Sequence, residues 1–206
     1  MYAYSNMGEM DKIANIANFG KEYGFDLMLS EPLPPLGNGK QADFLFMLQG
    51  KYDEKSVYEM SLRIRFPNPH DGIVEFMTLE RDGMREPNMY GSELLSDYQA
   101  PEGGYISEVL RTTKKSIGEK TAFRDDDFRR NYYFRVRSEV DESGRITKAN
   151  YGKIYGDFHF FAANKDWGYL ATLALVTTYY NPNNNDRNVE FDPKRNLLPS
   201  GNVQRP

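Results

Sequence analysis

Cysteine is absent from this sequence, and histidine is nearly absent. The chain has 206 residues, of which none is Cys and 2 are His, at positions 70 and 159. Without cysteine there is no disulfide framework, no thiolate nucleophile and no cysteine-ligated metal or iron–sulfur site. With only two histidines, a multi-histidine metal site is hard to build. The lack of disulfides does not fix the compartment, because exported bacterial proteins without disulfides are common.

The sequence also lacks a basic excess and long apolar runs. Its formal net charge is −4 and its isoelectric point is about 5.4, so nucleic acid is not an expected partner. No apolar run reaches the roughly 18 residues of a transmembrane helix. The first ten residues have neither a basic head nor an apolar stretch, so they do not predict a signal peptide. We expect any export signal, and any lipid anchor that follows it, to lie upstream of Met1.

Familiar catalytic motifs are missing as well. No G-x-S-x-G nucleophile turn occurs, and the glycines at 37 and 39 before Lys40 lack the spacing of a phosphate-binding loop. The sequence therefore predicts no catalytic residue, and it favours a protein that is not an enzyme without deciding the question.

Aromatic residues are abundant. The chain contains 15 Tyr and 13 Phe, and aromatics make up 14% of it. Tyr and Phe favour the half-buried surface of a β-sheet. Hydrophobic residues at 39% and charged residues at 27% are typical of a folded domain. We therefore predict a single, mainly β domain over residues 1–206, because this length suits one hydrophobic core.

The N-terminal part has a different pattern. Apolar residues recur at helical spacing within 9–23, and Gly24 follows as a stop signal, so we predict a helix over 9–23. Prolines and glycines then crowd the segment 24–40, which predicts an irregular, extended stretch.

The β-rich body is predicted over 41–198, with a tail at 199–206. Apolar residues at even positions from 58 to 66 alternate with polar or charged residues, as in a half-buried strand. The segment 134–140 alternates in the same way. The nearly continuous apolar run at 169–180 predicts a central strand that is buried on both faces.

One predicted strand, over 146–160, changes its pattern. Its apolar residues move from odd to even positions, and such a change needs one extra residue, so we predict a β-bulge near Gly152 or Gly156. The strands together suit an antiparallel β-sandwich, with a curved sheet packed on the N-terminal helix as the alternative.

The polar segment 181–192 is rich in oxygen ligands of the kind that Ca²⁺ prefers. The candidate ligands are Asn185, Asp186, Glu190 and Asp192. Their spacing does not match an EF-hand loop. A tight turn accounts for the same residues and is the favoured interpretation, because Asn and Asp tolerate left-handed backbone.

A second candidate site involves aromatic rings. Trp167, Tyr179 and Tyr180 lie at or near turns, where exposed rings can stack on the C–H face of a sugar. Asp157 follows a glycine in an aromatic strand and is the first candidate for a paired-carboxylate glycosidase. Burial of the rings in the core, and an Asp157 side chain re-aimed by a bulge and hydrogen-bonded to a loop, are the simpler alternatives.

Three segments near the C-terminus, 150–158, 178–182 and 185–197, carry the sequences NYGKIYGDF, TYYNP and NDRNVEFDPKRNL. They resemble uncharacterised exported proteins of gut Bacteroidetes, many of which look like lipoproteins, over about residues 130 to 198. The resemblance implies a β-rich fold and an extracytoplasmic location, anchored at the outer membrane or cell surface. It implies no activity and no catalytic residue.

Three hypotheses for function follow. The first is a non-catalytic binding or structural module exposed at the cell envelope, for a glycan or a protein partner. The second is a glycan-directed hydrolase with two carboxylates. The third is a subunit of a fimbria-like surface assembly.

Overall fold

The described part of the chain is built from β-strands. The computed structural model describes residues 2–4, 19–52, 58–78, 80–81, 84–85, 96–127, 129–162, 171–174 and 177–191. Every regular element within these ranges is a strand, so the prediction of a mainly β protein is confirmed.

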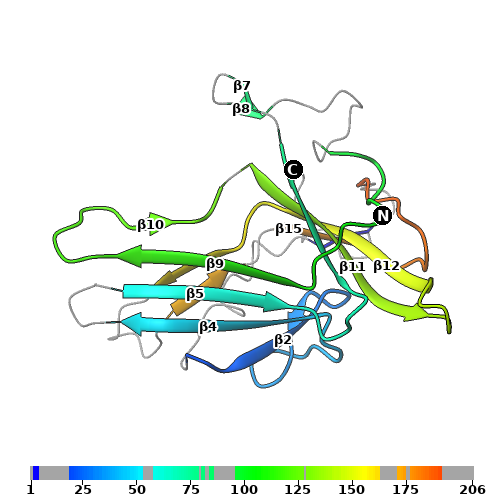
Figure 1. The fold of residues 1–206 in the computed structure, drawn as a ribbon, viewed down its shortest axis with the longest axis horizontal. Helices are drawn as coiled ribbons and strands as arrows, with labels where there is room; N and C mark the ends of the chain where they lie inside the picture. Colours follow the sequence, from blue (N-terminus) through cyan, green and yellow to red (C-terminus); the bar gives the residue numbers. More distant parts are fainter. Residues whose placement is uncertain are drawn as a thin grey trace.

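Two antiparallel sheets make up most of the molecule. The five-stranded sheet has the order β1 (Tyr2–Tyr4), β15 (Thr177–Asn181), β12 (Ile146–Tyr155), β11 (Arg130–Val140) and β6 (Gly72–Met77). The six-stranded sheet has the order β10 (Phe123–Arg124), β9 (Glu108–Lys115), β5 (Tyr58–Arg65), β4 (Phe44–Tyr52), β2 (Glu22–Asp26) and β3 (Glu31–Pro32). Two short hairpins join β13 (His159–Ala162) to β14 (Ala171–Ala174) and β7 (Glu80–Arg81) to β8 (Met84–Arg85). Figure 1 shows β4, β5 and β9 side by side, with β11 and β12 crossing them obliquely.

The main core lies between the two sheets. Alternate residues of β5, namely Met60, Leu62 and Ile64, are almost fully buried, and so are Phe134 of β11 and Ile154 of β12, which belong to the same cluster. The alternation seen at 58–66 therefore buries one face of a strand against the opposite sheet, as predicted.

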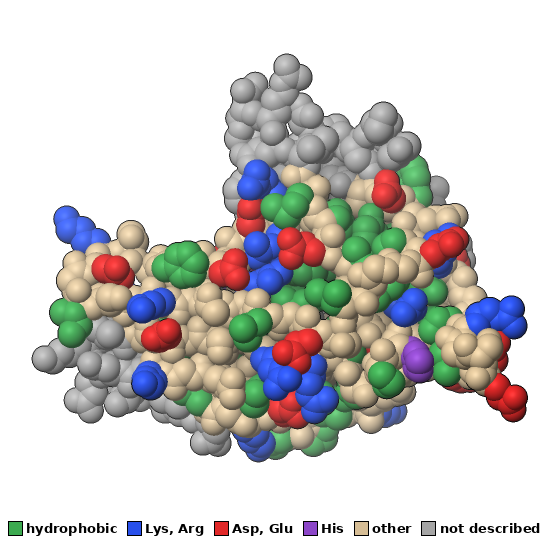
Figure 2. Space-filling view, in the orientation of Figure 1, with side chains coloured by type: hydrophobic (Ala, Val, Ile, Leu, Met, Phe, Trp, Pro, Cys, Tyr) green, Lys and Arg blue, Asp and Glu red, His purple; other side chains and the backbone are tan. Residues whose placement is uncertain are grey.

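The outer face of the six-stranded sheet is polar. Arg63 pairs at 2.6 Å with Glu108 on the neighbouring strand β9, and Arg65 pairs at 2.5 Å with Glu22 of β2, across the intervening strand β4. Figure 2 shows basic and acidic side chains interspersed over this face. Such a mixed, solvated face is typical of a sheet with one side in water.

The prediction of an N-terminal helix over 9–23 is wrong at its C-terminal end, which is the part that the structure describes. Glu22 and Tyr23 belong to β2, which continues through the predicted stop at Gly24. Tyr23 pairs with Phe46 of β4 and is buried beside it, so burial against the sheet outweighs the local helical spacing. Residues 9–18 lie outside the described residues. The segment 24–40 is also less irregular than predicted, since it contains the end of β2 and the short β3.

The ladder of β11 and β12 is irregular at two places, and neither lies near Gly152 or Gly156, the predicted positions. The main bulge is in β11, and a second shift, between Glu139 and Val140, leaves Thr147 of β12 unpaired in the ladder. The register shifts between Val136 and Glu139 of β11, where Arg137 has a φ of 57°. The pattern change in 146–160 has another cause, because β12 is covered on both faces. Its odd residues, such as Ala149, pack into a second cluster, whereas Ile154 faces the main core. The strand ends at Tyr155, before Gly156.

The second cluster covers the other face of the five-stranded sheet. Tyr179 of β15 packs there with Ala100 and Val189, which come from irregular segments on either side of an isolated bridge between Gln99 and Asn188. Tyr180, the next residue, faces the main core. This part of the predicted strand at 169–180 is therefore buried on both faces, as expected. Its described residues form two strands in different sheets, β14 and β15. The predicted tail at 199–206 lies outside the described residues.

Candidate functional site

A polar groove of about 560 Å³ lies beside the bulge of β11. Segments far apart in the sequence line it, and its polar lining residues include Gln41, Asn68, Arg137, Asn150 and Asn184. Pockets for small ligands commonly have volumes of about 300 to 1,000 Å³. The groove is therefore large enough to hold a small molecule or a short oligomer.

The bulge sets the shape of one wall. At the bulge, the backbone N–H groups of Arg137 and Ser138 turn away from the ladder and donate to the two carboxylate oxygens of Asp71, each at 2.9 Å. Asp71 lies in the turn before β6 and is itself buried. A buried N–H without a partner is costly, so this carboxylate fixes the bulge in place.

The Arg137 side chain lines the groove and is only 18% exposed, and we call this buried part of the lining the floor. Its Nε donates to Asp43 Oδ1 at 2.7 Å, and its Nη2 donates to Asp43 Oδ2 and Asp26 Oδ1, both at 2.9 Å. The guanidinium lies 5.7 Å from the centroid of the Tyr180 ring. Burial works to lower the pKa of Arg137, but the hydrogen bonds and charge of Asp43 outweigh it and raise that pKa. Burial raises the pKa of Asp43, and the hydrogen bonds from Arg137 oppose that rise.

Side-chain amides supply most of the remaining polar lining. Asn68 donates from Nδ2 to the Ser138 carbonyl at 2.7 Å, and Asn150 donates to the Asn181 carbonyl at 3.3 Å. Gln41 and Asn184 are exposed, and their side-chain amides make no hydrogen bond to other described residues. Each such amide can both donate and accept a hydrogen bond.

One ion pair stands at the mouth of the groove. Lys148 Nζ donates to Glu139 Oε1 at 2.5 Å, across the hairpin of β11 and β12. Both side chains are well exposed, at 42% for Lys148 and 61% for Glu139. Glu139 is the only carboxylate that lines the groove among the described residues.

The aromatic residues predicted to bind a sugar lie elsewhere than expected. Tyr179 and Tyr180 are 0% and 2% exposed, so neither ring offers an open stacking face. Tyr180 does line the groove, under the Arg137 guanidinium. Trp167 lies outside the described residues. The exposed apolar surface of the groove comes from Met28, which is 40% exposed, and from Pro182.

Asp157 occupies a closed polar network away from the groove. It is fully buried, and it accepts hydrogen bonds from Tyr132 Oη at 2.5 Å and from Arg130 Nη1 at 2.7 Å. The backbone N–H groups of Asp127 and Phe158 donate to it as well. Burial and the Asp157 carboxylate raise the pKa of Tyr132, so its phenol remains a donor.

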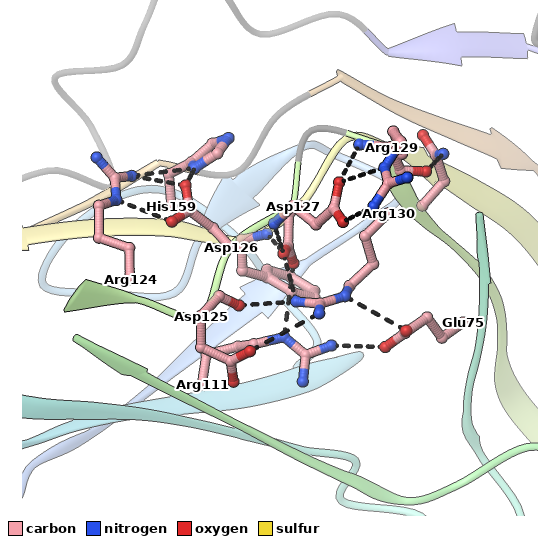
Figure 3. A network of polar contacts seen from close by, with 12 residues as sticks. Glu75, Arg111, Arg124, Asp125, Asp126, Asp127, Arg129, Arg130 and His159 are labelled. Atoms are coloured by element: carbon pink, nitrogen blue, oxygen red, sulfur yellow. Dashed lines mark hydrogen bonds and ion pairs between the residues drawn. The ribbon is translucent and has the colours of Figure 1, made fainter. Parts of the chain in front are cut away.

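Two arginines extend this network to the surface. Figure 3 shows Arg111 of β9 and Arg130 of β11 side by side, both reaching Glu75 of β6. Arg111 Nη2 lies 2.8 Å and Arg130 Nε lies 3.3 Å from the Glu75 carboxylate. A cavity of about 10 Å³ beside the network has room for about one water molecule. The network thus links β9 of the six-stranded sheet to β6 and β11 of the five-stranded sheet, which is a structural role.

The first residues of the candidate calcium segment form a hydrogen-bonded turn. Asn185 has a φ of 61°, accepts from the Ala149 N–H at 3.0 Å and donates to the Thr147 carbonyl at 2.9 Å. The Asp186 carboxylate accepts from the Asn181 side chain at 2.9 Å. These contacts are those of the tight turn that the sequence favoured.

The acidic residues further along do not join them in a ligand cluster. Glu190 Oε1 accepts the N–H of the next residue at 2.8 Å, and Asp192 lies outside the described residues. Within the described ranges, no group of three or more His, Asp or Glu residues is arranged to hold a metal ion. Binding of Ca²⁺ by this segment stays a prediction.

Among the described residues, Tyr180 is the one member of the groove lining that the sequence predicts as a site residue, and Asn184 lies within the candidate calcium segment. The polar residues that were missed include Gln41, Asn68, Arg137 and Asn150. Asn68 stands between two prolines, which marks a turn, and Asn150 begins one of the segments that carry the resemblance. Nothing in the sequence marked Arg137 as a site residue, because it occupies a polar position in the alternating pattern of 134–140, as a residue on the solvent-facing side of a strand does. Only the bulge, which depends on tertiary register, turns this side chain inward to Asp26 and Asp43.

Comparisons with protein-family models, with curated proteins and with solved structures found no match to the chain. The resemblance to exported Bacteroidetes proteins therefore stays a prediction. Within the described residues, no helix has the length and apolar character needed to cross a membrane. The case for a function accordingly rests on the geometry of the groove.

Proposed function

We propose that the protein is a non-catalytic binding module, and that the groove beside the β11 bulge binds an oligosaccharide. One observation carries the proposal: a groove of about 560 Å³ is lined by several side-chain amides whose hydrogen-bonding capacity is only partly used. The location that we propose, exposed at the cell envelope and anchored upstream of this chain, rests on the resemblance described above.

Sugar hydroxyl groups suit these walls. Each hydroxyl both donates and accepts, and so does each side-chain amide, so neighbouring hydroxyls can be matched by Gln41, Asn150 and Asn184. The C–H faces of a sugar ring need apolar contacts, which Met28 and Pro182 provide at the groove. The Arg137 ion pairs hold the floor rigid, and a preorganised site loses less entropy on binding.

The hydrolase hypothesis has less support. A glycosidase needs two carboxyl groups on either side of the scissile bond. Among the described lining residues Glu139 is the only carboxylate, and it is paired with Lys148. Asp157 is fully buried in another network.

A fimbria-like assembly would use a long, open sheet edge. At the edges of the two main sheets, the described strands β3 and β10 have two residues each, and β1 has three. β6 is longer, but Ile73 within it pairs with Ile106 through two backbone hydrogen bonds. These edges favour the binding module over strand exchange.

The test is a glycan microarray probed with three proteins. Wild-type protein should bind a defined set of oligosaccharides, and the double variant Gln41→Ala/Asn184→Ala should lose most of that signal. Both side chains are exposed, so the double variant is expected to fold. Gln49→Ala, which removes an exposed amide on the outer face of β4, is the matched control and should bind as wild type does. Absence of any bound glycan, or equal binding by the double variant, would remove the proposal.

A further inference from the structure

The cation at the floor of the groove is already neutralised. Arg137 makes three hydrogen bonds to Asp43 and Asp26, from Nε and Nη2, and its Nη1 lies 3.3 Å from the Met28 sulfur. The two carboxylate side chains are only 0% and 3% exposed, so solvent does not compete for this pairing.

An acidic sugar is usually held by a guanidinium fork that offers two parallel N–H groups. In this groove the Nε and Nη2 edge of Arg137 faces Asp43 and is occupied by it. A carboxylate or sulfate on a ligand would have to displace a buried side chain of the protein. That displacement would leave the buried Asp43 carboxylate without its cationic partner, with only the Leu27 N–H still donating to it, which is strongly unfavourable.

The other charges of the groove give an anion no advantage. Lys148 is paired with Glu139 at 2.5 Å. Counted with the carboxylates of Asp26 and Asp43 behind the floor, acidic groups outnumber the two cations. A negatively charged ligand therefore meets a weakly repulsive field, whereas an uncharged ligand meets amides on several sides.

From this geometry we infer that the ligand of the groove is a neutral oligosaccharide and that glycans carrying uronic acid or sulfate groups are rejected. The inference rests on the proposed function. It also gives Arg137 a positioning role: its side chain braces the floor and the bulge, and it does not clamp the ligand.

The same glycan microarray tests the inference when its hits are sorted by charge. Neutral oligosaccharides should bind, and their carboxylated or sulfated counterparts of the same linkage should bind at least about tenfold more weakly at low salt. Preferential binding of the acidic counterparts would overturn the inference and leave the proposed function standing. An array without any bound glycan would overturn both.

A charge variant provides the second measurement. Glu139→Gln removes the carboxylate that pairs with Lys148 at the mouth of the groove. Glu139 is well exposed, so this variant is expected to fold as the wild type does. In titration calorimetry at low salt, binding of an acidic counterpart should strengthen by about two- to fivefold, and added salt should abolish the gain. Glu59→Gln is the control, because it changes the net charge equally on an exposed face of β5 away from the groove. Equal effects of the two variants would show that the groove charge does not set the selectivity.

Discussion

Lys153 has an unusual environment for a lysine. Its side chain is fully buried, and its Nζ lies 5.6 Å from the ring centroid of Tyr133 and 6.0 Å from that of Phe76. It donates a hydrogen bond to Ser96 Oγ. Burial lowers the pKa of Lys153 to about 7, although the charges of Glu190 and Asp97 act in the opposite direction.

This lowered pKa makes stability depend on pH. An unfolded lysine has a pKa of about 10.4, so between pH 7 and pH 10 the unfolded chain binds more protons at this site than the folded chain does. Stability should therefore rise with pH in this window, by about 2 kcal/mol between pH 7 and pH 9. Above pH 10 the raised pKa of Tyr133, about 12, acts the other way.

Urea unfolding at pH 7 and pH 9 checks this prediction. Wild-type protein should show the gain, and Lys153→Met should not, because the methionine cannot take up a proton. Lys114→Met, which changes an exposed lysine of β9, should keep the gain. If the free energy of unfolding of the wild-type protein were the same at pH 7 and pH 9, the claim that burial lowers the pKa of Lys153 would be contradicted.

Asp157 supports a second prediction at the residue scale. Asp157→Asn removes the charge that faces Arg130 at 2.7 Å while the side chain keeps its shape. Arg130 is largely buried and would lose its closest and only fully buried carboxylate, keeping the longer contacts to the more exposed Glu75 and Asp125, so the free energy of unfolding should fall by about 3 kcal/mol. Asp125→Asn, at a 40% exposed carboxylate 3.7 Å from the same arginine, should cost less than about 1 kcal/mol. If chemical denaturation showed the same loss of stability for Asp157→Asn and Asp125→Asn, Asp157 would not be the central carboxylate of this buried network.

At the scale of elements, β12 is the strand on which both cores depend. It lies between β11 and β15, and its Gly152 pairs with Phe134 of β11 and with Tyr180 of β15. A Cβ at this position would lie 2.2 Å from both the Phe134 ring and the Tyr179 carbonyl oxygen. The glycine was expected to mark a bulge, and instead it makes room for an aromatic ring of the adjacent strand.

Gly152→Ala should therefore destabilise the protein by about 2 kcal/mol or more, since neither the ring nor the backbone can move far. Gly103→Ala is the matched control, because nothing lies within 4 Å of its added Cβ. Thermal unfolding of the two variants separates the cases, and a Tm for Gly152→Ala equal to that of wild type would refute the close packing at β12.

Local sequence patterns predicted some of these elements and not others. The strict alternation of 58–66 identified β5, because a half-buried strand imposes that period on its own residues. The helix predicted at 9–23 failed at Tyr23, where pairing with Phe46 decides the structure. The bulge was assigned to β12 because a pattern change has two causes, an extra residue or burial on both faces, and a single strand cannot distinguish them.

At the scale of the whole molecule, the groove is assembled from segments that are distant in the sequence. Met28 and Gln41 come from around β2 and β3, Asn68 from the turn after β5, and Asn184 from the turn after β15. Arg137 joins them through ion pairs with residues 94 and 111 positions earlier in the chain. Contacts between such distant residues leave no periodic pattern in the sequence. The sequence therefore predicted binding sites at aromatic rings and at an acidic turn instead of at this groove.

The most direct test of the oligosaccharide site is a two-dimensional NMR titration with the neutral oligosaccharide that binds most strongly on the array. The side-chain amide signals of Gln41, Asn68, Asn150 and Asn184 should shift together as ligand is added, and Gln49 on the outer face should stay still. Shifts confined to other surfaces, such as the Asp125–Arg130 network, would contradict the assignment of the groove as the binding site.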